Sequence, residues 1–178
     1  MAEEPAPPAP PERVVLIGFM GAGKSTVGPL VAGRLGWTFL DLDARLEERA
    51  GRAIAEIFRE QGEPAFRALE REVAEEATRQ ARTVFAAGGG AFAEPATREV
   101  LRRRAVTVWL RCDLETLLAR VPADGRRPLA ANRDIMRRLL GEREPSYQLA
   151  DVVVDASAAT PDAVAGEVVE KLRARGIV

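Results

Sequence analysis

The chain contains no histidine and only one cysteine, Cys112, among its 178 residues. Histidine is the commonest metal ligand and the usual acid or base near neutral pH, so its absence leaves proton transfer to carboxylates. A single cysteine cannot form a disulfide within the chain or build a thiolate zinc site. These absences exclude a disulfide scaffold and a metal enzyme that relies on histidine or cysteine ligands.

Long apolar runs and an excess of one charge are also absent. Every apolar run is shorter than the roughly 20 residues that cross a bilayer, and the net charge is -1. The start, Met1-Ala-Glu-Glu, has neither the basic region nor the apolar stretch of a secretion signal. We therefore expect a monomer in the cytoplasm that binds neither nucleic acid nor membrane.

Lysine is scarce, because only Lys24 and Lys171 are lysines among 26 basic residues. Lys24 lies in GFMGAGKST, residues 18–26, which matches the phosphate-binding loop pattern G-x-x-x-x-G-K-S/T. An apolar run at 13–17 precedes the loop and an amphipathic stretch at 26–35 follows it, so the loop joins a strand to a helix. Inward-facing backbone N–H groups and the helix N-terminus then attract an anion.

This loop predicts binding of ATP together with one Mg²⁺ ion. Lys24 would contact the β- and γ-phosphates, and the Ser25 hydroxyl would ligate the metal. The expected ATP-binding residues of the loop are Gly21, Ala22, Gly23, Lys24, Ser25 and Thr26. A glycine-rich turn with an incidental lysine is the alternative. It is disfavoured because a chain that otherwise uses arginine has here the slimmer ammonium that fits inside a phosphate cradle.

Short apolar runs alternate with amphipathic stretches along the chain. We expect strands at 13–17, 38–42, 83–87, 105–110 and 151–154, and helices at 26–35, 62–82, 96–103, 114–120, 133–140 and 161–175. The alternation predicts an α/β protein, with helices on both faces of a parallel sheet of about five strands. The length fits one domain, 12–178, after a proline-rich tail, 1–11, that we expect to be disordered.

Residues that follow the strands are candidates for a second site, because ligands of parallel sheets bind at the carboxyl ends of the strands. Asp41 and Asp43 are two residues apart, so their side chains can serve Mg²⁺ and a second substrate separately. Asp43 can equally cap the helix that follows, and taken alone its position favours capping. Gly88–Gly90 either admits a ligand close to the backbone or forms a flexible turn.

The segment 121–133 is punctuated by glycine and proline and contains Arg127. It is typical of a mobile lid that brings an arginine onto the transferring phosphate. The chain lacks the D-x-x-G and N-K-x-D motifs of GTPases, and Ala156 follows Val152–Asp155 where a motor ATPase would carry glutamate. A kinase that acts on a small molecule is therefore the favoured class.

The motifs taken together resemble the shikimate kinase family. The match runs through GFMGAGKSTVG, DLDARLEERAGRAIAEIFREQGEPAFRALE, GGGAF, RRPLA and REPSYQLAD, and covers almost everything after Pro11. The loop alone is generic, whereas D-x-D, F-R-x-x-E, GGG and R-P-L in this order are specific. The resemblance implies the P-loop kinase fold and ATP-dependent phosphorylation of shikimate to shikimate 3-phosphate, in aromatic amino acid (chorismate) biosynthesis.

The resemblance also implies roles around the nucleotide. Asp41 would hold Mg²⁺ through water, and Asp43 would contact the acceptor hydroxyl as a candidate general base. Arg127 would be the lid arginine that spans both substrates. Arg120 and the loop near Pro161 would flank the adenine.

For the acceptor, the resemblance implies a helical substrate-binding segment at about 42–70. Arg67 in this segment, together with Arg143, would clamp the shikimate carboxylate through paired guanidinium hydrogen bonds. Glu70 would orient Arg67 from behind. The glycines Gly88, Gly89 and Gly90 would lie against the shikimate ring.

Two alternatives stay open at this point. A kinase for another small acid, such as gluconate, would share the loop and an arginine clamp, although the D-x-D and F-R-x-x-E patterns favour shikimate. A catalytically inactive relative would bind ligand and regulate a partner. Such a relative is expected to lose Lys24, Asp43 or Arg127, and all three are present.

Overall fold

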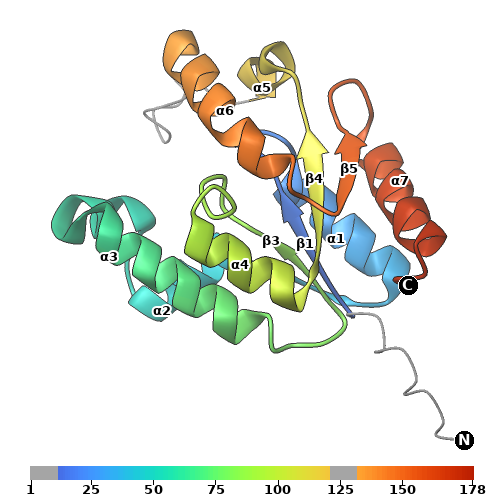
Figure 1. The fold of residues 1–178 in the computed structure, drawn as a ribbon, viewed down its shortest axis with the longest axis horizontal. Coiled ribbons are helices and arrows are strands. Elements are labelled where there is room, and N and C mark those ends of the chain that lie inside the picture. Colours follow the sequence, from blue (N-terminus) through green and yellow to red (C-terminus); the bar gives the residue numbers. More distant parts are fainter. Residues whose placement is uncertain (1–11, 121–131) are drawn as a thin grey trace, which may run out of the picture.

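The structure, a computed structural model, describes residues 12–120 and 132–178. It places them in three layers, with a parallel sheet between two layers of helices (Figure 1). The strands are β1 (Arg13–Ile17), β2 (Thr38–Asp41), β3 (Thr83–Ala86), β4 (Val106–Arg111) and β5 (Val152–Asp155). Their order is β2-β3-β1-β4-β5, and all neighbouring pairs are parallel. The predicted fold class is confirmed, whereas the expected tail and most of the expected lid, with Arg127, lie outside the described residues.

The helices of the described residues are α1 (Lys24–Leu35), α2 (Leu42–Ala50), α3 (Ile54–Ala77), α4 (Pro95–Arg104), α5 (Leu114–Arg120), α6 (Arg133–Tyr147) and α7 (Pro161–Ala174). Figure 1 shows α1 beside α7 on one side of the sheet and α3 beside α4 on the other. Within the described ranges, no helix has the length and apolar character needed to cross a membrane.

β1 is the central strand of the sheet, and its sequence explains this place. Val14–Ile17 is an unbroken apolar run, and all four side chains are fully buried. A strand covered by helices on both faces requires such a run, whereas the edge strand β2 remains partly exposed.

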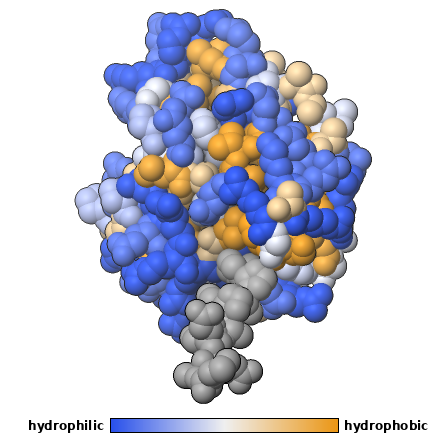
Figure 2. All heavy atoms as spheres, turned by 45° about the vertical axis from the view of Figure 1, so that its right-hand side comes forward, coloured by the Kyte–Doolittle hydropathy of each residue, from blue (hydrophilic) through white to orange (hydrophobic). Residues whose placement is uncertain are grey.

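The surface seen in Figure 2 is mostly hydrophilic, and its apolar residues form patches between charged side chains.

Helix α3 is bent at Gly62, whose backbone has φ 80° and ψ 173°. Glycine tolerates this positive φ, and Pro64 lies just after the bend, in the first turn of the second part, where its missing N–H has no helical partner to lose. The sequence predicted only this second part.

The helical segment expected at 42–70 contains α2 and much of α3. These two helices enclose a small core that is separate from the main one. That core consists of Leu46, Ile57, Phe66 and Val73.

Helix α6 is longer than the sequence predicted. The expected end was residue 140, because Gly141 and Pro145 are usual signals for the end of a helix. The structure continues the helix through Pro145 to Tyr147. Met136 and Tyr147 are both fully buried, and burial of two large side chains offsets the roughly 3 kcal/mol that an internal proline costs.

Candidate active site

Residues 18–26 connect the end of β1 to the start of α1. Gly18, Gly21 and Gly23 have φ values of 147°, 83° and 98°, a region that residues with a Cβ rarely adopt. A Cβ at Gly18 would also lie 2.8 Å from the carbonyl oxygen of Leu110. Because α1 begins directly after Gly23, its first N–H groups border the loop. The loop therefore has the backbone shape of an anion site.

The two lysines of the chain have different surroundings. The Lys24 ammonium donates to the carbonyl oxygens of Gly18, at 2.7 Å, and Phe19, at 2.9 Å. It thus lies back across the loop, where it can reach a phosphate held by the backbone. The Lys171 ammonium donates to the carbonyl oxygen of Val153 at 2.7 Å and pairs with Glu167 on its own helix.

Asp41 links the phosphate loop to α2. Its Oδ2 accepts a 2.9 Å hydrogen bond from the Ser25 hydroxyl, and its Oδ1 accepts from the backbone N–H groups of Asp43 and Ala44. Asp41 is therefore the N-cap of α2, and the interpretation of Asp43 as the cap is wrong. The reason is that β2 ends one residue earlier than predicted, so the helix begins at Leu42 and Asp43 falls inside its first turn.

The Ser25 hydroxyl and the Asp41 carboxylate are oxygen donors of the kind that Mg²⁺ prefers. In the part of the chain that the structure describes, no group of three or more histidine, cysteine, aspartate or glutamate residues could hold a metal ion. A Mg²⁺ ion that arrives with a nucleotide needs only one or two protein ligands beside phosphates and water. The donor set fits such an ion.

The segment between β3 and α4, residues 87–94, is called here the glycine segment. Each of its three consecutive glycines lies against a different side chain of the predicted acceptor site. The atom nearest to an added Cβ would be Asp43 Oδ1 at 2.7 Å for Gly88, Arg143 Nη1 at 3.2 Å for Gly89 and Arg67 Nη2 at 2.5 Å for Gly90. The glycines therefore leave room for three functional side chains that the structure brings together from three helices.

Arg67 is held by a buried carboxylate. Its Nη1 donates to Glu70 Oε2 at 2.7 Å, and the Glu70 side chain is only 7% exposed. Burial raises the pKa of Glu70, while the charge of Arg67 opposes that rise. The Nε and Nη2 groups of Arg67 also lie 3.4 Å from Oε1 of the exposed Glu63. A guanidinium carries five N–H donors, so the Glu70 pair fixes Arg67, and a bound carboxylate would share or replace the longer contacts with Glu63.

Arg143 connects the two halves of the site. Its guanidinium carbon lies 5.5 Å from the ring centroid of Phe19, which belongs to the phosphate loop. The same guanidinium lies beside Gly89 of the glycine segment. A ligand bound by Arg143 would therefore sit next to an anion held in the loop.

The residues expected near the adenine lie on the side of the phosphate loop away from the glycine segment, because β4 and β3 flank β1 on opposite sides. Arg120 Nη2 donates to the carbonyl oxygen of Ala156 at 2.8 Å, and its Nη1 lies 3.4 Å from Cys112 Sγ. The stretch after β5 then leads to Pro161, the first residue of α7, which is capped by Thr160. The structure thus brings Arg120 to the stretch that ends at Pro161, and their contact with adenine stays a prediction.

Two residues of this region were missed by sequence reasoning. Tyr147 donates through its hydroxyl to the carbonyl oxygen of Gly89, and Arg98 donates to the carbonyl oxygens of Phe92 and Ala93. Tyr147 lies within REPSYQLAD but was given no role there, and no motif marks Arg98. The available signal was the four-residue spacing from Arg143 to Tyr147, which the apparent stop at Pro145 hid.

A phosphate loop after the central strand of a parallel sheet, with an arginine-lined site beside it, defines a P-loop kinase that acts on a small acid. The profile of the shikimate kinase family matches residues 20–173. A shikimate kinase of Moorella thermoacetica is 43% identical over 92% of this chain and 96% of its own length. One of Gloeobacter violaceus is 47% identical over 90% and 92% of the two chains.

Solved structures agree with the sequence relatives. Shikimate kinase from Acinetobacter baumannii in complex with shikimate superposes with a TM-score of 0.88, at 33% identity, covering 96% of this chain and 97% of that one. Shikimate kinase from Aquifex aeolicus gives a TM-score of 0.80 at 34% identity, covering 93% and 98%. The chain belongs to the shikimate kinase family.

Proposed function

We propose that this chain transfers the γ-phosphoryl group of ATP to the 3-hydroxyl of shikimate, giving ADP and shikimate 3-phosphate. The observation that carries the proposal is the convergence of Asp43, Arg67 and Arg143 on the glycine segment, beside the phosphate loop. The Acinetobacter baumannii relative, solved in complex with shikimate and similar over 96% of this chain, supports the choice of acceptor.

The donor end binds the nucleotide. The backbone N–H groups of residues 18–26 surround the phosphates, and Lys24 contacts the β- and γ-phosphates from across the loop. Ser25 and Asp41 would hold Mg²⁺, Asp41 through water. The ion would neutralise negative charge on the phosphates. Arg120 and Pro161 flank the adenine in this proposal. Arg127, which lies outside the described residues, would contact the γ-phosphate.

The acceptor end binds shikimate by its carboxylate and its hydroxyl. Arg67 and Arg143 clamp the carboxylate, and Glu70 keeps Arg67 in the required orientation. Asp43 then accepts a hydrogen bond from the 3-hydroxyl and orients or takes its proton. Phosphoryl transfer requires mainly positioning and charge stabilisation, which these side chains provide without any histidine.

A panel of acceptors tests the reaction. ADP release from Mg·ATP is measured with shikimate, with gluconate and without an acceptor, and the product is identified by mass spectrometry. We expect release to depend on shikimate and to yield shikimate 3-phosphate. Gluconate turned over as fast as shikimate would reject the acceptor, and binding without turnover would indicate an inactive relative.

Asp43→Asn tests the role of the carboxylate. Because Asp41 caps α2, this substitution leaves the cap intact and removes only the charge that faces Gly88. We expect kcat to fall about a hundred- to ten-thousandfold while the KM for ATP stays unchanged. A variant with normal turnover and lower stability would show that Asp43 has a structural role.

A further inference from the structure

The two ends of the glycine segment are fixed by the core, because the Ala87 N–H donates to the carbonyl oxygen of Leu16 and the Phe92 side chain is fully buried. Within the segment, the carbonyl oxygen of Gly88 accepts from the N–H of Ala91, and that of Gly90 accepts from the N–H groups of Ala93 and Glu94. The carbonyl oxygen of Gly89 instead accepts from Tyr147, which lies on α6 and 58 residues away in sequence. The middle glycine is thus tied to another element of the fold.

Tyr147 is suited to be a permanent donor. Its side chain is fully buried and packs against Trp109, with ring centroids 5.8 Å apart. Burial raises the pKa of Tyr147 to about 12, although Arg143 and Arg67 act in the opposite direction. The phenol therefore stays protonated, and its hydrogen bond to Gly89 persists, throughout the neutral pH range.

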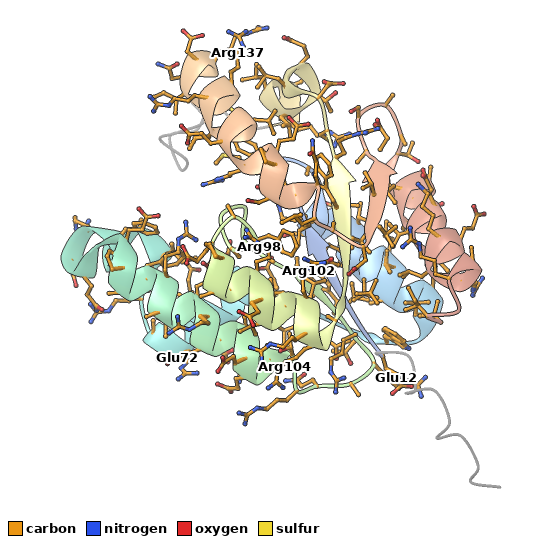
Figure 3. The ribbon with its side chains drawn as sticks, viewed as in Figure 1. Glu12, Glu72, Arg98, Arg102, Arg104 and Arg137 are labelled. Atoms are coloured by element: carbon orange, nitrogen blue, oxygen red, sulfur yellow. The ribbon has the colours of Figure 1, made fainter. Side chains whose placement is uncertain are left out.

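A second tie joins the same two elements. Arg98 Nη1 donates to the carbonyl oxygen of Phe92 at 3.1 Å and lies 3.3 Å from the hydroxyl of Ser146, the residue before Tyr147. Figure 3 shows Arg98 between α4 and the C-terminal end of α6. The end of α6 therefore contacts the glycine segment directly through Tyr147 and indirectly through Arg98 of α4.

We propose that Tyr147 is a positioning residue for the acceptor site. By holding the carbonyl of Gly89, it sets the distance between the glycine segment and Arg143, which lies one helical turn earlier on α6. Gly88 and Gly90 lie on either side of Gly89 in the chain and move with it. The same bond therefore sets the approach of Asp43 and Arg67. The inference rests on the proposed acceptor site and extends it from the residues that touch shikimate to the residue that places them.

Tyr147→Phe is the test, because it removes the hydroxyl and keeps the ring that packs on Trp109. Steady-state kinetics are measured with each substrate varied in turn. We expect the KM for shikimate to rise about three- to tenfold, the range that one net buried hydrogen bond provides. The KM for ATP should change less than about twofold, because the nucleotide is bound by a different segment.

Two further variants separate positioning from stability. Thr78→Val removes another buried hydroxyl, which donates to the carbonyl oxygen of Ala74 at 2.6 Å near the end of α3, so it should lower stability and leave the shikimate KM unchanged. Ser146→Ala removes the contact with Arg98 and should raise the shikimate KM about twofold. Equal rises for both substrates, or a shikimate-specific rise in Thr78→Val, would overturn the inference.

Arg143→Ala distinguishes this inference from the function on which it rests. An unchanged shikimate KM in Arg143→Ala would overturn the acceptor site itself. A raised KM in Arg143→Ala with unchanged values in Tyr147→Phe and Ser146→Ala would overturn the inference alone. In the double variant, we expect Tyr147→Phe to add less than it does in the wild type, because both changes act on one contact. Full additivity would contradict a role that acts through Arg143.

Discussion

The two ends of the active site are built in different ways. The phosphate end is one run of chain, residues 18–26, in which backbone conformation and a single lysine form the site. The acceptor end takes Asp43 from α2, Arg67 from α3 and Arg143 from α6 and gathers them on the glycine segment. Local sequence therefore defines the first end, whereas helix packing defines the second.

This difference has a structural counterpart in the two cores. The phosphate loop begins at the end of β1, whose side chains belong to the main core. Arg67 lies on a helix whose inner side belongs to the small core around Phe66. The acceptor residues thus depend on the packing of α2 against α3 as well as on the sheet. Substitutions at the two ends should consequently separate in their effects on the two substrates.

The largest effect is expected at the phosphate end. Lys24→Ala should lower kcat/KM about a thousandfold by removing the charge aimed at the γ-phosphate, with an unchanged circular dichroism spectrum. Lys171→Ala is the matched control, because that ammonium bonds the carbonyl oxygen of Val153 on β5 and pairs with Glu167 on α7, and it should keep wild-type turnover. Similar losses in both variants would show that Lys24 is a structural residue.

The next effect concerns the acceptor end. Arg67→Ala should raise the KM for shikimate about ten- to a hundredfold, equivalent to roughly 1.5–3 kcal/mol for one charge-assisted contact, and leave the KM for ATP unchanged. Arg67→Lys should rescue poorly, because an ammonium cannot make the planar two-point contact. Both KM values come from initial rates of ADP release.

Its control is Arg71→Ala, one turn further along the same helix on an exposed position. This variant should retain the wild-type KM for both substrates. Arg67→Ala also leaves Glu70 buried without its ion pair, so the double change with Glu70→Gln should recover stability but not shikimate binding. An Arg67→Ala enzyme with a normal shikimate KM would remove the distinction between the two ends.

A smaller effect should follow from crowding the acceptor residues. Gly90→Ala would place a Cβ 2.5 Å from Arg67 Nη2, so the guanidinium must move, and the shikimate KM should rise about three- to tenfold. Gly33→Ala is the control, since an added Cβ in α1 would meet no other described part of the chain within 4 Å. That variant should keep wild-type kinetics and gain about 0.5–1 kcal/mol of stability. Normal kinetics in Gly90→Ala would show that Arg67 has room to adjust.

The same contrast decides what the sequence could predict. The phosphate loop and the strands were predicted nearly to the residue, because their patterns are local. The assignment of the α2 cap failed because a one-residue shift at the end of β2 moves that role from Asp43 to Asp41. The contact between Tyr147 and Gly89 spans 58 positions, and no local pattern encodes such a pair.

The smallest expected effect is on stability at alkaline pH, and it tests whether the Tyr147 hydroxyl that holds the acceptor end is buried. The chain has a single tyrosine, so phenolate absorbance reports Tyr147 alone. Burial raises its pKa from 10.0 to about 12. In the unfolded chain the phenol therefore ionises first, and between these two values the folded state holds more protons. Its contribution to stability is complete below pH 10 and is lost as the pH rises toward 12.

Urea unfolding of the wild type and Tyr147→Phe at about pH 9 and about pH 11 measures this contribution. The wild type should lose more stability than the variant between the two conditions, because other ionisable groups affect both proteins alike. The absorbance change of the folded wild type should be centred near pH 12. A folded phenol that titrates near its ordinary pKa of 10.0 would place Tyr147 in contact with water. Its bond to Gly89 would then be too exposed to hold the glycine segment, and the acceptor end would lose its direct tie to α6.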